Sequence, residues 1–86
     1  MNADEVKEKL RIYICRQFIN NPTYPLDDHE PLITGGLMDS FSLAQIGVFI
    51  EKEFDIYIPD TDLTVEKMDT LSQISLCVMS RSNDQV

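Results

Sequence analysis

Ser40 is the residue with the clearest chemical potential in this sequence, because it follows Asp39 directly at the start of an amphipathic segment. A serine in that position commonly caps a helix through its side-chain oxygen. The same position also points a hydroxyl group outward at the positive end of the helix dipole, where free amides would stabilise an attached phosphate. The residues around Ser40 therefore allow two interpretations, a simple helix cap and an attachment site for a phosphate group.

The other side chains that could support catalysis are poorly placed for it. The single histidine, His29, lies in a segment rich in proline and acidic residues, which favours a solvated loop side chain over a catalytic base. Cys15 and Cys77 have apolar neighbours and no histidine nearby in sequence, so reduced core cysteines are favoured over nucleophiles or a disulfide. We therefore expect a protein that is not itself an enzyme.

The sequence Asp60-x-Asp62-x-Thr64 resembles the opening of a calcium-binding loop. Such a loop needs a glycine at its sixth position and a bidentate glutamate at its twelfth, where this chain has Val65 and Leu71. We interpret these acids as the charged start of a short helix and expect no metal site.

The charge balance restricts the partners that this protein can bind. The chain has 86 residues, enough for one small domain, and its 15 acidic and 7 basic residues give a net charge of −8. Residues 27–69 hold eleven acids against two lysines, a balance of −9. This charge argues against binding to nucleic acid or to anionic membranes.

No apolar run approaches the roughly 20 residues of a membrane helix, and the charged N-terminal residues do not resemble a signal peptide. We expect a cytoplasmic monomer.

The apolar periodicity predicts three long helices and one short helix, packed as a small antiparallel four-helix bundle. The long helices are expected from Ala3 to about Asn20, from Asp39 or Ser40 to about Phe54, and from Thr70 to about Ser80. A short helix or turn is expected within residues 61–67. Residues 21–38 are expected to form a long ordered loop, residues 1–81 a single domain, and residues 82–86 a frayed tail. The residues expected to face inward are Val6, Leu10, Ile12, Tyr13, Ile14, Cys15, Phe18, Ile19, Leu26, Leu32, Ile33, Leu37, Leu43, Ile46, Gly47, Ile50, Phe54, Leu71, Ile74 and Val78.

The second long helix also carries apolar residues on its outer side. Phe41 and Val48 are rotated by more than about 140° from the inward residue Ile46, and they lie seven residues apart on one line. Gln45 and Lys52 lie close to that line. Together these residues predict a docking strip that begins at Ser40.

The ordered set Gly-Leu-Met-Asp39-Ser40, Glu-Lys-Glu-Phe-Asp at residues 51–55, Ile-Pro-Asp at residues 58–60 and Thr-Leu at residues 70–71 resembles the centre of an acyl carrier protein. With the first helix, the resemblance to this phosphopantetheine-binding family covers nearly the whole chain. It implies an all-α bundle of the acyl-carrier-protein type. It also implies that a phosphopantetheinyl transferase attaches 4′-phosphopantetheine from coenzyme A to the Ser40 Oγ, and that the arm's thiol carries an acyl or aminoacyl group as a thioester.

The resemblance assigns roles to further residues. Asp39 would help the transferase to recognise the site, while the acidic segment would attract basic surfaces of loading ligases and of downstream synthases or transferases. The residues expected to contact partners are Met38, Phe41, Gln45, Val48, Glu51, Lys52, Glu53 and Asp55. Ser42 and Gln45 stand where fatty-acid carriers have acids, and the segment from Asp60 to Thr70 is longer than theirs. These departures favour a specialised carrier in a fatty-acid, polyketide, nonribosomal-peptide or amino-acid-transfer pathway. The alternative is a helical adaptor that needs no prosthetic group.

Overall fold

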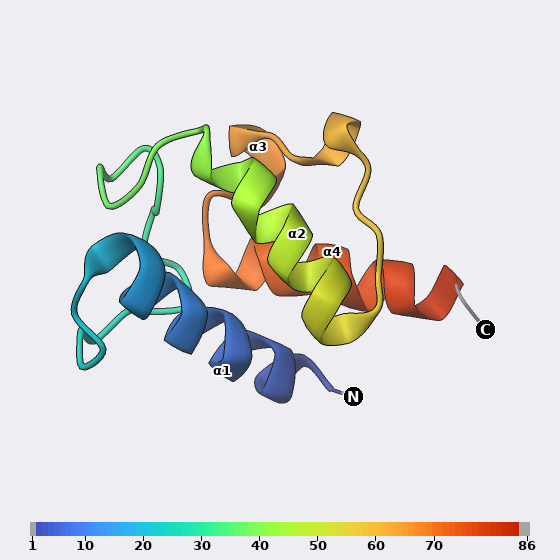
Figure 1. The fold of residues 1–86 in the computed structure, drawn as a ribbon, viewed down its shortest axis with the longest axis horizontal. Coiled ribbons are helices and arrows are strands. Elements are labelled where there is room, and N and C mark those ends of the chain that lie inside the picture. The colour runs from blue at the N-terminus through green and yellow to red at the C-terminus, as the bar shows by residue number, and fades with distance from the viewer. Residues whose placement is uncertain (1, 85–86) are drawn as a thin grey trace.

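The computed structural model describes residues 2–84, and its secondary structure over that range is entirely helical (Figure 1). The predicted all-α class is therefore confirmed. Helices of 12, 13 and 14 residues form the long elements and a four-residue helix forms the short one. The helices are α1 (Ala3–Ile14), α2 (Ser42–Phe54), α3 (Val65–Met68) and α4 (Leu71–Asp84), with a π-helical turn at Cys15–Ile19 and a 3-10 turn at Asp60–Asp62.

The first helix begins and ends close to its predicted limits. The Asn2 Oδ1 atom accepts a hydrogen bond from the Glu5 N–H at 2.8 Å and so satisfies one of the free amides of the first turn. After Ile14 the helix widens into the π-helical turn, which ends at Asn20 in the left-handed conformation with φ of 60°. The extent to about Asn20 is confirmed, while the change of helix type at Cys15 was not expected.

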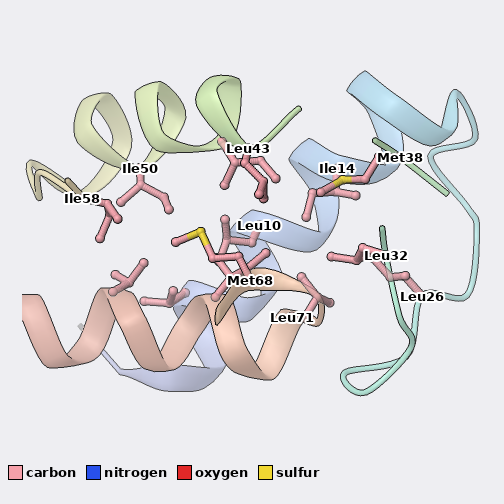
Figure 2. Close-up of a cluster of buried hydrophobic side chains, with 14 of the residues drawn as sticks. Leu10, Ile14, Leu26, Leu32, Met38, Leu43, Ile50, Ile58, Met68 and Leu71 are labelled. Atoms are coloured by element: carbon pink, nitrogen blue, oxygen red, sulfur yellow. The ribbon is translucent and has the colours of Figure 1, made fainter. Parts of the chain in front are cut away.

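The helices and the long loop share one apolar core, part of which Figure 2 shows. α1 packs against α4, and α3 also contacts α4. The predicted inward positions of α2 and α4 are confirmed, because Leu43, Ile46, Ile50, Leu71, Ile74 and Val78 are all buried. The prediction for Ile12 is wrong, since its side chain is 45% exposed. Ile12 lies two residues from the buried Leu10, which places it about 200° around the helix from that residue.

The loop between the first two helices is held in place by specific contacts. The side chains of Leu26 and Leu32 are buried in the core, as predicted. The Arg11 Nε donates a hydrogen bond to the Leu26 carbonyl at 3.0 Å, and the Leu32 N–H donates to the Asp69 carbonyl at 2.7 Å. Despite its length, this loop approaches Ser40 along a fixed path.

The last helix has the predicted start but not the predicted end. The Thr70 Oγ1 accepts from the Gln73 N–H at 3.1 Å, as in a capping box, whereas the Gln73 Oε1 accepts from the Asp69 N–H instead of from Thr70. α4 continues to Asp84, beyond its predicted end at about Ser80, and the fraying expected from Ser82 onward stays a prediction. An ion pair from Arg81 to Asp62 secures the last turns. Residues 85–86, also assigned to the tail, lie outside the described range.

Candidate functional site

Ser40 lies in a turn immediately before α2, and its neighbour Asp39 accepts a hydrogen bond from the first amide of the helix. The Asp39 Oδ1 accepts hydrogen bonds from the Ser42 N–H at 3.1 Å and from the Ser42 hydroxyl at 3.2 Å. The Leu43 N–H donates to the Ser40 carbonyl at 3.3 Å. The predicted start of this helix was therefore two to three residues too early, because a tighter turn stabilised by Asp39 precedes the regular helix.

The Ser40 hydroxyl is free of the capping role that its position suggested. The residue is exposed, and its hydroxyl makes no hydrogen bond to any residue in the range 2–84. Over the same range, the N–H groups of Ser40 and Phe41 have no hydrogen-bond acceptor. A phosphate on the Ser40 Oγ would therefore find free amide donors at the positive end of α2. The residues present fit a phosphate-linked group at this position.

A carboxylate from a distant part of the chain fixes the loop that leads to Ser40. The Asp69 Oδ1 accepts from the Ile33 N–H at 2.8 Å and from the Thr34 N–H at 3.1 Å, and its Oδ2 accepts from the Thr34 hydroxyl at 2.6 Å. Burial alone would raise the pKa of Asp69, but these hydrogen bonds outweigh it and hold the pKa below its ordinary value. Asp69 is thus a positioning residue for the loop, and sequence analysis did not find it.

Most of the predicted docking strip is exposed on the outer side of α2. The side chain of Phe41 is 84% exposed and that of Val48 is 51% exposed. The polar and charged residues expected beside them are also exposed: Gln45, Glu51, Lys52, Glu53 and Asp55.

Met38 is the exception among the residues expected to contact partners. Its side chain is only 8% exposed and belongs to the buried core (Figure 2). The loop turns inward at Met38 because the N–H groups of Leu37 and Met38 both donate to the Leu32 carbonyl, at 2.9 and 3.0 Å. The prediction of Met38 as a surface contact is therefore corrected: it anchors the residues that precede Ser40.

The remaining candidate residues gain no chemical role from the fold. His29 is exposed, and its N–H donates to the Asp27 carboxylate at 3.0 Å. Cys15 and Cys77 are both free thiols, as predicted. Burial raises the pKa of each thiol, which disfavours the reactive thiolate.

The acids of the calcium-like sequence serve other contacts in the fold. Asp62 forms ion pairs with Lys67 and Arg81, and hydrogen bonds from both cations lower its pKa. Within the described part of the chain, no group of three potential ligands is suited to hold a metal ion. No helix in that part has the length and the apolar character needed to cross a bilayer.

Comparison with known proteins identifies no relative of this chain: no family model matches it, and no curated protein is significantly similar to it. A functional assignment therefore depends on the residues and geometry of this chain.

Proposed function

We propose that this protein is a carrier that holds acyl or aminoacyl groups as thioesters on a 4′-phosphopantetheine arm attached to Ser40. The observation that supports it best is the exposed, unbonded hydroxyl of Ser40 at the start of α2, beside an Asp39 that already stabilises the first turn. A serine needed only as a cap would use its own oxygen. The proposal includes the arrangement of the helices as an antiparallel bundle of the acyl-carrier-protein type.

Ser40 takes part in one covalent step under this proposal. Its Oγ attacks the phosphorus of coenzyme A that bears the pantetheine group, inside a phosphopantetheinyl transferase. A new O–P bond forms and the bridging P–O bond of the diphosphate breaks, so that adenosine 3′,5′-bisphosphate leaves. The hydroxyl proton passes to a base of the transferase. The attached arm supplies the terminal thiol on which cargo is carried as a thioester, and tethering raises the effective concentration of that cargo at each partner.

The outer side of α2 guides partner enzymes to Ser40 in this proposal. Phe41 and Val48 offer apolar contacts at 84% and 51% exposure, while Glu51, Glu53 and Asp55 attract basic surfaces. The partners are a phosphopantetheinyl transferase, a loading ligase and downstream synthases or transferases. The departures from fatty-acid carriers seen in the sequence favour a specialised biosynthetic pathway. We expect this pathway to operate in the cytoplasm.

Mass spectrometry of the intact protein tests the attachment directly. After incubation with coenzyme A and a phosphopantetheinyl transferase of broad specificity, the protein should gain the mass of one phosphopantetheinyl group. Ser40→Ala should gain none, while the control Ser80→Ala, which changes an exposed serine of α4, should behave like the wild type. Failure of the wild type to be modified by any such transferase, or modification of Ser40→Ala, would refute the proposal.

A helical adaptor without a prosthetic group is the second candidate, and the 84% exposure of Phe41 favours it independently of Ser40. An adaptor would keep its function in Ser40→Ala and lose it in Phe41→Ala or Val48→Asp. A carrier would lose its function in Ser40→Ala. Because Phe41 and Val48 serve docking in both candidates, the function of Ser40→Ala, which an adaptor keeps and a carrier loses, separates them.

A further inference from the structure

A groove open to solvent runs between α2 and the first helical segment, which is α1 together with the π-helical turn, and its lining includes Gln45, Val48 and Lys52 of the docking strip. It consists of two adjoining hollows of about 300 and 330 Å³, which share Tyr13, Phe49 and Glu53. The rings of Tyr13 and Phe49 are stacked, with centroids 4.0 Å apart and an angle of 12° between their planes. We call this feature the α1–α2 groove and define it by Ile12, Tyr13, Arg16, Val48, Phe49 and Lys52.

The groove combines an apolar wall with exposed apolar side chains. Ile12 is 45% exposed and Val48 is 51% exposed, and they line opposite hollows on either side of the stacked pair. Exposed aliphatic groups next to an aromatic wall can bury further area against a partner. The same stacking joins the first helical segment to α2, so the surface is formed before any partner binds.

The two basic residues that form no ion pair within the described residues both line this groove. Of the seven lysines and arginines, five form ion pairs with acids of the described residues. The two that form none within that range are Arg16 and Lys52, and both line the groove. A third cation, Lys9, also lines it and reaches Glu53 at 3.3 Å. Glu53 lines both hollows as well, so three cations face one carboxylate there, and the groove is a locally positive site on a chain whose net charge is −8.

We propose that the α1–α2 groove binds an acidic segment of a partner protein, with apolar side chains interspersed among its carboxylates. The apolar side chains would contact Ile12, the Tyr13–Phe49 stack and Val48, while the carboxylates would accept hydrogen bonds from Arg16 and Lys52. Charge complementarity selects this occupant. A second copy of the chain, with its net charge of −8, or a nucleic acid, with a charge at every phosphate, would bring far more negative charge against the acidic remainder of the domain than a short segment does.

This site differs from the acidic surface of α2 in the charge that it selects. Glu51 and Asp55, which do not line the groove, attract basic partners, whereas Arg16 and Lys52 attract acidic ones. The inference needs neither the hydroxyl of Ser40 nor a prosthetic group, so it can succeed or fail independently of the proposed function. The Ser40→Ala variant should accordingly bind the partner's acidic segment as tightly as the wild type does.

A titration followed by NMR tests the proposal. The probe is a short synthetic peptide in which glutamates flank one leucine and one phenylalanine, and its control replaces each glutamate with lysine. The acidic peptide should shift the backbone amide signals of Tyr13, Arg16 and Phe49. The Arg16→Gln/Lys52→Gln variant should weaken binding about tenfold at low salt, since two exposed ion pairs are lost.

The matched control is Lys7→Gln/Lys67→Gln, which has the same net charge but removes cations that pair with Asp28 and Asp62 outside the groove. It should change the affinity by less than about twofold, as a weak effect of overall charge. Equal weakening by both double variants would overturn the proposal, as would equal binding of the basic peptide or shifts confined to other surfaces. Concentration-dependent dimerisation that Arg16→Gln/Lys52→Gln abolishes would also overturn it, because the occupant would then be a second copy.

Discussion

The change Asp69→Asn is the most informative test of how the fold holds Ser40 in place. It preserves the size of the side chain but removes the charge that accepts hydrogen bonds from Ile33 and Thr34. A hydrogen bond to a charged group contributes about 1 kcal/mol more than one to a neutral group. Three such bonds set an upper limit of about 3 kcal/mol, and the exposure of Thr34 lowers the expected loss to about 1.5 kcal/mol.

Thermal unfolding measured by circular dichroism at neutral pH should show this loss. A domain of this size loses roughly 4–8 °C of melting temperature for each kcal/mol, so Asp69→Asn should melt about 6–12 °C lower than the wild type. The matched control is Asp27→Asn, because the Asp27 carboxylate accepts one local hydrogen bond, from the exposed His29 N–H at 3.0 Å. Its melting temperature should fall by no more than about 3 °C.

The dependence on pH gives this prediction a second and sharper readout. The hydrogen bonds lower the pKa of Asp69 in the folded state, so its contribution to stability is complete above the ordinary carboxyl pKa of about 4. That contribution is lost as the pH falls through the lowered pKa of the folded state, because the protonated side chain then resembles asparagine. Urea unfolding between about pH 7 and pH 2.5 should therefore show the difference between wild type and Asp69→Asn shrinking below about pH 4. Equal losses in Asp69→Asn and Asp27→Asn, or a difference that is independent of pH, would refute the reasoning.

Three further predictions concern the loop that leads to Ser40, the acidic residues 27–69 and the docking strip. Gly35→Ala should cost at least about 2 kcal/mol in urea unfolding, since a Cβ there would overlap the Pro31 carbonyl oxygen. Gly36→Ala should cost about 1 kcal/mol for its φ of 84° alone, and an equal cost at both glycines would contradict the overlap. The melting temperature should rise between low salt and about 0.5 M salt, because the acids of residues 27–69 repel one another; a flat profile would mean that this repulsion is small. Phe41→Ala should change the free energy of unfolding by less than about 0.5 kcal/mol while weakening capture of partner enzymes, and unchanged capture would remove Phe41 from the docking strip.

The helices were predictable because the information that specifies them is local. Leu10 and Ile14 lie four residues apart, as do Ile74 and Val78, and this spacing alone places each pair on one face of a helix. The cap that Thr70 provides could likewise be read three residues before Gln73. The exposure of Phe41 followed from the same rotation rule, because the inward face of α2 determines which residues point outward.

The features that were missed depend on contacts between residues far apart in sequence. Asp69 is 35 and 36 residues from the loop residues that it holds, and no spacing in the sequence connects them. The burial of Met38 depends on a turn closed by the Leu32 carbonyl, which the flanking glycines did not specify. Likewise, the ion pair from Arg81 to Asp62 joins α4 to a turn 19 residues earlier in the chain.

The two proposals assign opposite charges to two sides of one helix, and this has a consequence for how partners bind. α2 supplies Val48 and Lys52 to the groove and also supplies Glu51 to the acidic surface. A basic enzyme attracted to the acidic surface is repelled by Arg16 and Lys52, which limits the orientations in which it can approach Ser40. An acidic segment bound in the groove would neutralise these two cations and remove that restriction. The segment would also cover Val48, an apolar contact of the docking strip, so a partner seated in the groove and a basic partner at Ser40 would compete for that residue.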